Sequence, residues 1–109
     1  MAQRIMAARG LPDSPLDAAA AFQTRHIPAI RASGTGDDCV IVFDHADHTH
    51  NGWRQAMVQE LAREAAPARV NAVAGPDGAL LREVVEYLAS APGVTGQVLQ
   101  LDGNLAKVD

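Results

Sequence analysis

Three of the four histidines and two of the aspartates fall within one stretch of eight residues, Asp44-His45-Ala46-Asp47-His48-Thr49-His50-Asn51, called the octet below. His45, His48 and His50, together with Asp44 or Asp47, offer the nitrogen and oxygen ligands that zinc and similar divalent ions take. The octet follows a short apolar run, and open α/β sheets place their ligands just beyond the carboxyl ends of their strands. One interpretation of the octet is therefore a metal site.

The spacing and the surroundings of the octet favour a different interpretation. The pattern H-x-x-H-x-H matches no zinc motif that we can justify, and in an extended segment His48 and His50 would point one way and His45 the other. A polar, exposed loop before a helix gives the same composition, with Asp47 or a nearby Thr or Asn capping the helix that begins near residue 52. We therefore favour a capped loop and keep the metal site as the alternative.

The elements on either side of the octet are an expected strand and an expected helix. Residues 39–43, Cys-Val-Ile-Val-Phe, form a continuous apolar run that is typical of a strand buried on both faces. After the octet, apolar residues recur at helical spacing until Pro67. They are Trp53, Met57, Val58, Leu61, Ala62 and Ala65. The octet is thus the link from a strand to a helix.

The rest of the chain repeats this alternation. Ser14, Pro15 and Asp17 form a helix start, and Pro28 predicts a kink or an early end before residue 33. Residues 5–8, 69–74 and 97–101 read as strands, and residues 80–88 as a third helix. Strands that alternate with helices imply parallel pairing. We predict one α/β domain over residues 1–109, with about four parallel strands and three helices in the order β-α-β-α-β-α-β.

Composition limits the classes of partner. The chain has 109 residues and a net charge of −4, and its nine Lys and Arg residues are scattered, which argues against nucleic acid and against anionic membranes. The single cysteine, Cys39, cannot form an internal disulfide and suggests a reducing compartment. No segment has the length of a membrane span, and the start lacks the pattern of a secretory signal. We expect a soluble, cytoplasmic protein.

Two segments resemble the short-chain dehydrogenase/reductase (SDR) family. Residues 61–76, LAREAAPARVNAVAGP, resemble the family's LA-x-E-L-A-x-x-x-I-R-V-N-x-V-x-P-G, and residues 87–104 are similar to its ending, F-L-x-S followed by T-G-Q-x-x-x-V-D-G-G. Upstream, residues 22–34 and 40–43 look like the family's fifth helix and fifth strand. The resemblance covers the second half of a family member and implies a partial Rossmann-like sheet.

The catalytic positions of the family are changed. Counting back from the match at residues 61–67 places Asp47 where the family has its catalytic tyrosine and Asn51 where it has the lysine. An aspartate and a neutral amide offer no equivalent acid or cation. The family's serine falls near Asp44 or His45, and its helix asparagine near Pro15. We therefore assign no catalytic residue, and the sequence leans away from an enzyme.

Two further parts of the family pattern are missing. The glycine-rich turn that binds the pyrophosphate of the nicotinamide cofactor belongs to the half that this chain does not match, so we assign no cofactor-binding residue and expect no NAD(P). The long segment that covers the substrate after the P-G pair is replaced here by Asp77 and Gly78, which lead almost directly to the third helix.

Three hypotheses remain for the function. The first is a catalytically inactive SDR-like half domain that forms a homo-oligomer or binds an SDR-like partner. In the family the helices matching residues 16–32 and 52–66 form one interface, and the last helix and strand form another. The second is a small metal-binding protein or metal-dependent enzyme that uses the octet. The third is an oxidoreductase subunit that is active only with a full-length SDR partner.

Overall fold

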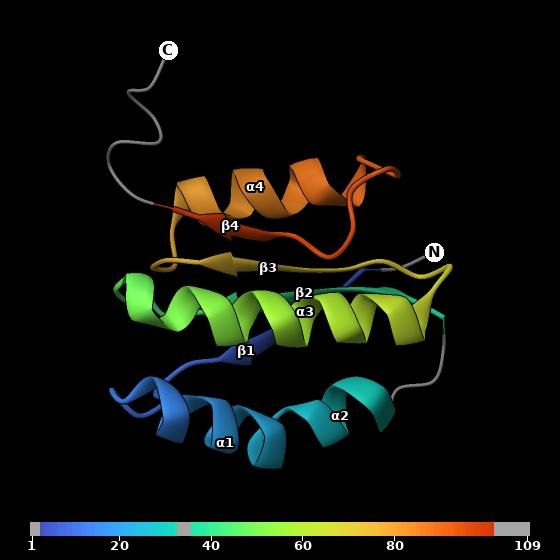
Figure 1. Cartoon of the computed structure of the whole chain (residues 1–109). Helices are drawn as coiled ribbons and strands as arrows, with labels where there is room; N and C mark the ends of the chain where they lie inside the picture. The colour runs from blue at the N-terminus through green and yellow to red at the C-terminus, as the bar shows by residue number, and fades with distance from the viewer. Residues whose placement is uncertain (1–2, 33–35, 102–109) are drawn as a thin grey trace.

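Strands and helices alternate along the whole described chain. The computed structural model describes residues 3–32 and 36–101 (Figure 1). Its strands are β1 (Gln3–Ala8), β2 (Asp38–Phe43), β3 (Val70–Ala74) and β4 (Val98–Gln100). Its helices are α1 (Pro15–Arg25), α2 (Ile27–Ala32), α3 (Asn51–Ala65) and α4 (Ala79–Ala89), with a 3₁₀ turn, η1 (His48–His50), before α3. No helix in these described ranges is long and apolar enough to cross a membrane.

The four strands form one parallel sheet in the order β1-β2-β3-β4. β1 pairs with β2 along its full length, from Gln3 opposite Asp38 to Ala8 opposite Phe43. Because all four strands run in one direction, their carboxyl ends share one edge of the sheet. The octet follows β2 directly and lies at that edge. The predicted α/β class and parallel sheet are confirmed.

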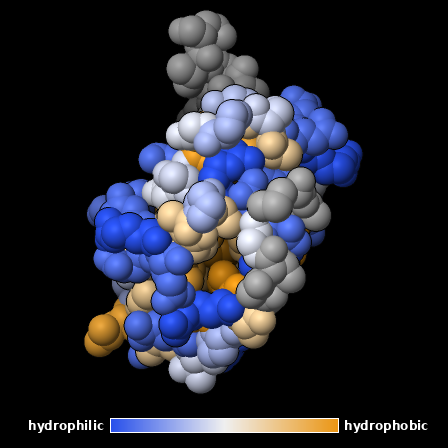
Figure 2. Space-filling view, turned by 90° about the vertical axis from the view of Figure 1, so that its right-hand side faces the viewer, coloured by the Kyte–Doolittle hydropathy of each residue, from blue (hydrophilic) through white to orange (hydrophobic). Residues whose placement is uncertain are grey.

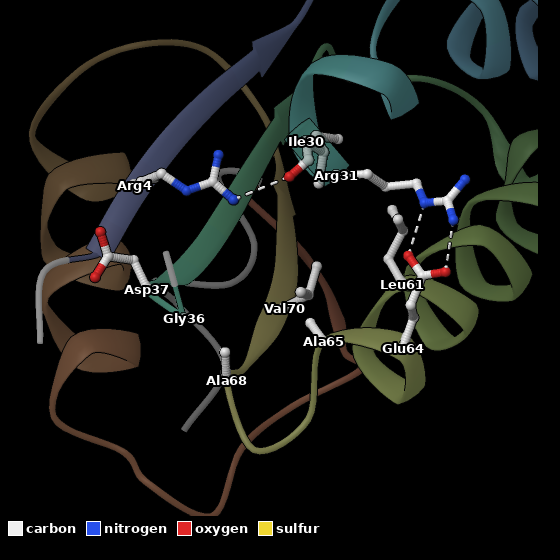
Figure 3. Close-up of a pocket in the computed structure, with 10 residues that line it drawn as sticks. All are labelled: Arg4, Ile30, Arg31, Gly36, Asp37, Leu61, Glu64, Ala65, Ala68 and Val70. Atoms are coloured by element: carbon white, nitrogen blue, oxygen red, sulfur yellow. Dashed lines mark hydrogen bonds and ion pairs between the residues drawn. The ribbon is translucent and has the colours of Figure 1, made fainter. Parts of the chain in front are cut away.

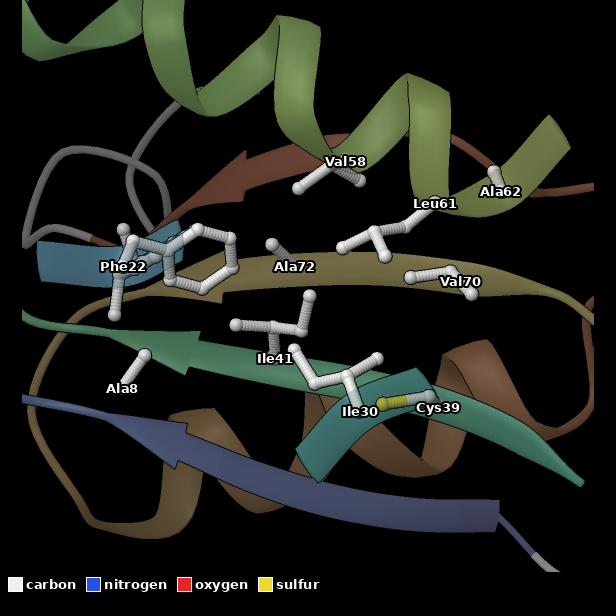
Figure 4. Packing of buried hydrophobic residues seen from close by; sticks show 12 residues of the cluster. Ala8, Phe22, Ile30, Cys39, Ile41, Val58, Leu61, Ala62, Val70 and Ala72 are labelled. Carbon is white, nitrogen blue, oxygen red and sulfur yellow. The ribbon is translucent and has the colours of Figure 1, made fainter. Parts of the chain in front are cut away.

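Alternate residues of β2 pack into two separate cores, one on each face of the sheet. Cys39, Ile41 and Phe43 contribute to a core with α1, α2 and α3, part of which Figure 4 shows. Val40 and Val42 contribute to the opposite core, beneath α4. Every residue of β2 after Asp38 is buried, which confirms the prediction of a strand covered on both faces.

The crossover from β3 to β4 has the opposite hand from the other two. The β1–β2 and β2–β3 connections place α1, α2 and α3 on one face, whereas α4 lies on the other face. Since the strands are parallel and their order advances in one direction, the third connection must turn the other way. Right-handed connections account for about 98% of such units, so the sheet contains one rare crossover. α4 is consequently the only described helix on its face.

The first expected helix is divided into two. α1 starts as predicted, with Ser14 as its cap, because the Ser14 hydroxyl accepts a hydrogen bond from the Asp17 N–H at 3.3 Å. The break falls at His26, two residues before the proline, so that Pro28 lies in the first turn of α2. A proline is tolerated in a first turn because the N–H that it lacks has no helical partner there.

Arg69 and Asp38 join the starts of β2 and β3 to the end of α4. The Asp38 carboxylate accepts hydrogen bonds from the Arg69 backbone N–H at 2.8 Å and from Arg69 Nη2 at 2.6 Å. Arg69 Nη1 donates to the Leu88 carbonyl at 2.9 Å and to the Ala91 carbonyl. Burial raises the pKa of Asp38, but the hydrogen bonds from Arg69 outweigh that effect and the pKa is lowered.

We expect Asp38→Asn to lower the free energy of unfolding by roughly 2–4 kcal/mol at pH 7, because it leaves the Arg69 cation largely buried without its anion. Since the pKa of Asp38 is lowered in the folded protein, its contribution is complete above pH ~4 and is lost as the pH falls through the folded value. Urea unfolding followed by circular dichroism at pH 7 and pH 3 measures both effects.

The control is Glu60→Gln, which removes the carboxylate of the exposed Arg63–Glu60 pair. An exposed pair contributes little, so this variant should unfold almost as the wild type does. Equal losses in the two variants would contradict the role assigned to Asp38.

Candidate functional site

A pocket of about 330 Å³ lies at the carboxyl ends of β1 and β2. The residues around it come from the end of β1, the link to α1, α1 itself, the octet and α3. They are Ala8, Leu11, Pro12, Asp13, Ala18, Asp44, His45, Ala46, Asp47, His50 and Arg54. Open α/β sheets bind ligands at this edge, so the octet does line the position at which a site is expected.

Asp44 holds the carboxyl ends of β1 and β2 together. Its carboxylate accepts a hydrogen bond from the Gly10 N–H at 2.8 Å and one from Arg9 Nη1 at 2.8 Å. The Gly10 N–H and the Arg9 side chain lower the pKa of Asp44, so it is a carboxylate at neutral pH. Arg9 Nη2 also donates to Asp77 at 3.0 Å, which ties in the loop that follows β3.

Asp47 serves as a cap for the helical segment after the octet. Its Oδ1 accepts hydrogen bonds from the Thr49 hydroxyl and, at 2.9 Å, from the Thr49 backbone N–H. Both interactions lower the pKa of Asp47, and the side chain is exposed. Asp47 is a cap as predicted, but it caps η1, the turn that leads into α3, and no side chain caps α3 itself.

His50 is buried, and both of its ring nitrogens are occupied. Trp53 Nε1–H donates to His50 Nδ1 at 3.0 Å, and His50 Nε2 lies 2.9 Å from the carbonyl oxygen of Asp13. A neutral imidazole whose Nδ1 accepts a hydrogen bond carries its proton on Nε2, and this N–H then donates to the Asp13 carbonyl. The imidazole therefore bridges α3 and the link before α1.

The other two octet histidines differ from His50 in burial. His45 and His48 are exposed, whereas His50 is 6% exposed. Among residues 3–32 and 36–101, no three His, Cys, Asp or Glu side chains are grouped closely enough to hold a metal ion. The metal site at His45, His48, His50 and Asp47 stays a prediction that no feature of this arrangement favours.

Sequence reasoning missed Arg54, the one cation on the buried face of α3. Arg54 is 4% exposed and lies in line with Val58 and Leu61, so the buried stripe runs one residue later than the Trp53–Met57 spacing suggested. Its guanidinium carbon is 4.4 Å from the centre of the Phe43 ring. The signal that reveals it is an arginine four residues before a buried valine on one helix face.

The family follows from a comparison with known proteins. A family model described as short chain dehydrogenase-like protein matches residues 6–101. This chain belongs to the SDR-like family. No curated protein and no solved structure matched it significantly. The matched range runs from β1 to the residue after β4, which confirms the resemblance and leaves the activity open.

The link after β1 does not fit the pyrophosphate of a nicotinamide dinucleotide. In a cofactor-binding turn, glycine N–H groups and a helix N-terminus face the phosphates. In the SDR-like chain the Gly10 N–H donates to the Asp44 carboxylate, and the Asp17 N–H in the first turn of α1 donates to the Ser14 hydroxyl. Asn51, which the resemblance predicts to stand at the position of the family lysine, is a neutral side chain at the start of α3.

A second pocket, of about 290 Å³, lies at the opposite edge of the sheet (Figure 3). Seen from the side where the strands begin, apolar residues lie at the bottom of a hollow surrounded by polar ones (Figure 2). Arg31 forms a two-bond pair with Glu64, and Arg4 donates through Nη2 to the Ile30 carbonyl at 3.2 Å, while the buried Arg4 Nε has no partner among the described residues. The pocket at the carboxyl edge is the better candidate.

We expect nitrogen NMR to find the His50 ring protonated at Nε2 and unprotonated at Nδ1. Trp53→Phe removes the donor to Nδ1 but keeps an aromatic ring. The nitrogen chemical shift of Nδ1 should then move toward that of an imidazole nitrogen that accepts no hydrogen bond. The loss of the hydrogen bond should cost roughly 1 kcal/mol in the free energy of unfolding. Long-range proton–nitrogen spectra test this, with exposed His48 as the internal control. A proton on Nδ1 of the wild type would contradict the bridge.

Proposed function

We propose that this SDR-like chain is a catalytically inactive half domain that acts by associating with another chain. Support comes first from the catalytic positions. Asp47, at the position of the family tyrosine, is ionised at neutral pH because its pKa is lowered, and it caps η1. A carboxylate in this state has no proton to donate to a substrate. Asn51 supplies no charge that would replace the family lysine.

The observation that carries the proposal is the open edge of β1. Within the described residues β1 pairs with β2 and with no other strand. On its other side no described strand pairs with its backbone groups, and such an edge can recruit a strand of another chain. An association through this edge needs no rearrangement of the sheet.

The face of β1 on the α4 side is also uncovered. Gln3 donates to the Val85 carbonyl at 3.1 Å, and this is where α4 reaches β1. Further along the strand Ile5 is 57% exposed, and Ala7 is exposed as well. The single described helix on this face covers β2 and β3 and leaves Ile5 and Ala7 of β1 exposed. An exposed isoleucine on an open edge is a hazard unless another chain covers it.

The proposed partner is a second copy of the chain. Closed two-fold pairs are the commonest oligomers, and two identical edges can pair antiparallel about a two-fold axis. An axis through Ile5 would set the two Ile5 side chains opposite each other as a cross-strand pair. The runner-up partner is a full-length SDR-like protein, which would present its own strand to the same edge.

We expect Ile5→Lys to convert the oligomer into a monomer, because a lysine in the centre of the edge places two like charges opposite each other. Native mass spectrometry and light scattering measure the change. The same spectrum reports any retained ion or nucleotide, and one metal ion per chain would support the octet alternative instead.

The matched controls are Leu16→Lys and Tyr87→Lys. These two side chains are 82% and 56% exposed and lie on the helical surfaces that the family resemblance names as interfaces. Both variants should keep the oligomer. Dissociation by either control would move the interface from β1 to that helix, and a wild type that stays monomeric at tens of micromolar would contradict self-association.

A further inference from the structure

Arg54 is a buried cation that forms no direct ion pair with a described carboxylate. Among residues 3–32 and 36–101, no carboxylate oxygen lies within 4.0 Å of its guanidinium, since none of the observed salt bridges includes it. Its Nε atom is buried and has no hydrogen-bond partner. Buried charges in proteins are normally paired. An arginine held in this way calls for an anion that comes from outside the chain.

The surroundings of Arg54 fix its guanidinium at the pocket. Its guanidinium carbon lies over the ring of Phe43, 4.4 Å from the ring centre, and is 5.7 Å from the centre of the Trp53 ring. Both rings belong to one aromatic cluster with Phe22, so the guanidinium packs against a set of mutually contacting rings. Burial lowers the pKa of Arg54, and Asp44 offsets this effect only in part. Burial of the Arg54 cation therefore costs free energy, and a bound anion would offset that cost.

The carboxylates around the pocket form no ion pair with Arg54, although the charge of Asp44 acts on it in part. Asp44 is already held by Arg9 and Gly10. Asp47 caps η1 through Thr49. Asp13 and Asp47 are both exposed, so they line the pocket as hydrogen-bond acceptors on its solvent side. The pocket thus combines one buried cation with a rim of acceptors.

We propose that this pocket binds a small monocarboxylic acid that carries hydroxyl groups. The carboxylate would meet the planar fork of Arg54, which matches a carboxylate in two parallel hydrogen bonds. The hydroxyl groups would donate to the rim carboxylates. A doubly charged phosphate fits less well, because the three aspartates around the pocket repel a second negative charge. The volume of about 330 Å³ lies within the range of small-molecule sites.

The test titrates nitrogen-labelled protein with glycerate in a buffer low in chloride. Glycerol, which has hydroxyl groups but no carboxylate, and inorganic phosphate are the comparison probes. We expect saturable shifts of the Ala46 amide and of the Arg54 Nε–H with glycerate, no saturable shift with glycerol, and weaker binding of phosphate. A response to glycerol equal to that of glycerate, tighter binding of phosphate, or no saturation with glycerate would overturn the proposal.

Arg54→Met keeps an unbranched side chain over Phe43 and removes the charge, so the affinity for glycerate should fall about tenfold or more, as expected for lost charged hydrogen bonds. Arg63→Met on the exposed face of the same helix is the control and should bind as the wild type does. If circular dichroism shows that Arg54→Met does not fold, Arg54→Lys decides: it keeps the charge without the fork and should bind more weakly than the wild type. Undiminished binding by a folded Arg54 variant would overturn the proposal. The β1 edge plays no part in this test, so its outcome is independent of the oligomeric state.

Discussion

The pair between Asp38 and Arg69 sets the relative position of three parts of the fold. Asp38 opens β2, Arg69 precedes β3, and the guanidinium also holds the carbonyls at the end of α4. Two residues further on, Asn71 donates to the Val94 carbonyl at 3.0 Å and accepts from the Gln97 N–H at 3.0 Å. Together the two side chains position the loop that returns from α4 to β4. The rare crossover of the sheet depends on this loop.

This arrangement explains which residues of the family pattern the chain retains. The match at residues 61–76 includes Arg69 and Asn71, and both serve packing at the amino-terminal half of the sheet. At the opposite edge, two aspartates of the octet also serve the fold. Asp47 caps a turn, and Asp44 ties two strand ends together through Arg9. The polar groups of the octet are thus largely engaged in closing the carboxyl edge of the sheet.

How far the sequence predicts this structure depends on the range of the interactions. The buried strand at residues 39–43, the Ser14 cap and the Asp47 cap are set by neighbours within a few residues, and each was predicted. The break at His26 was placed too late, because a proline can be accommodated in the first turn of a new helix. Contacts across long separations, such as Arg9 with Asp77, leave no local pattern.

Local sequence patterns predict neither which face of α3 is buried nor which face of the sheet α4 covers. Trp53 and Arg54 both fit a helical stripe, and only the ring of Phe43, which β2 presents to the helix, makes the arginine the buried one. Likewise, periodicity shows that α4 has an apolar face but not which face of the sheet it covers. That choice leaves β1 bare on the α4 side, while Ala8 at its end lines the pocket on the other side. One short strand therefore borders both an open edge and the pocket at the carboxyl ends of the strands. Because its alternate residues face opposite ways, Ile5 can be changed without touching the surroundings of Arg54.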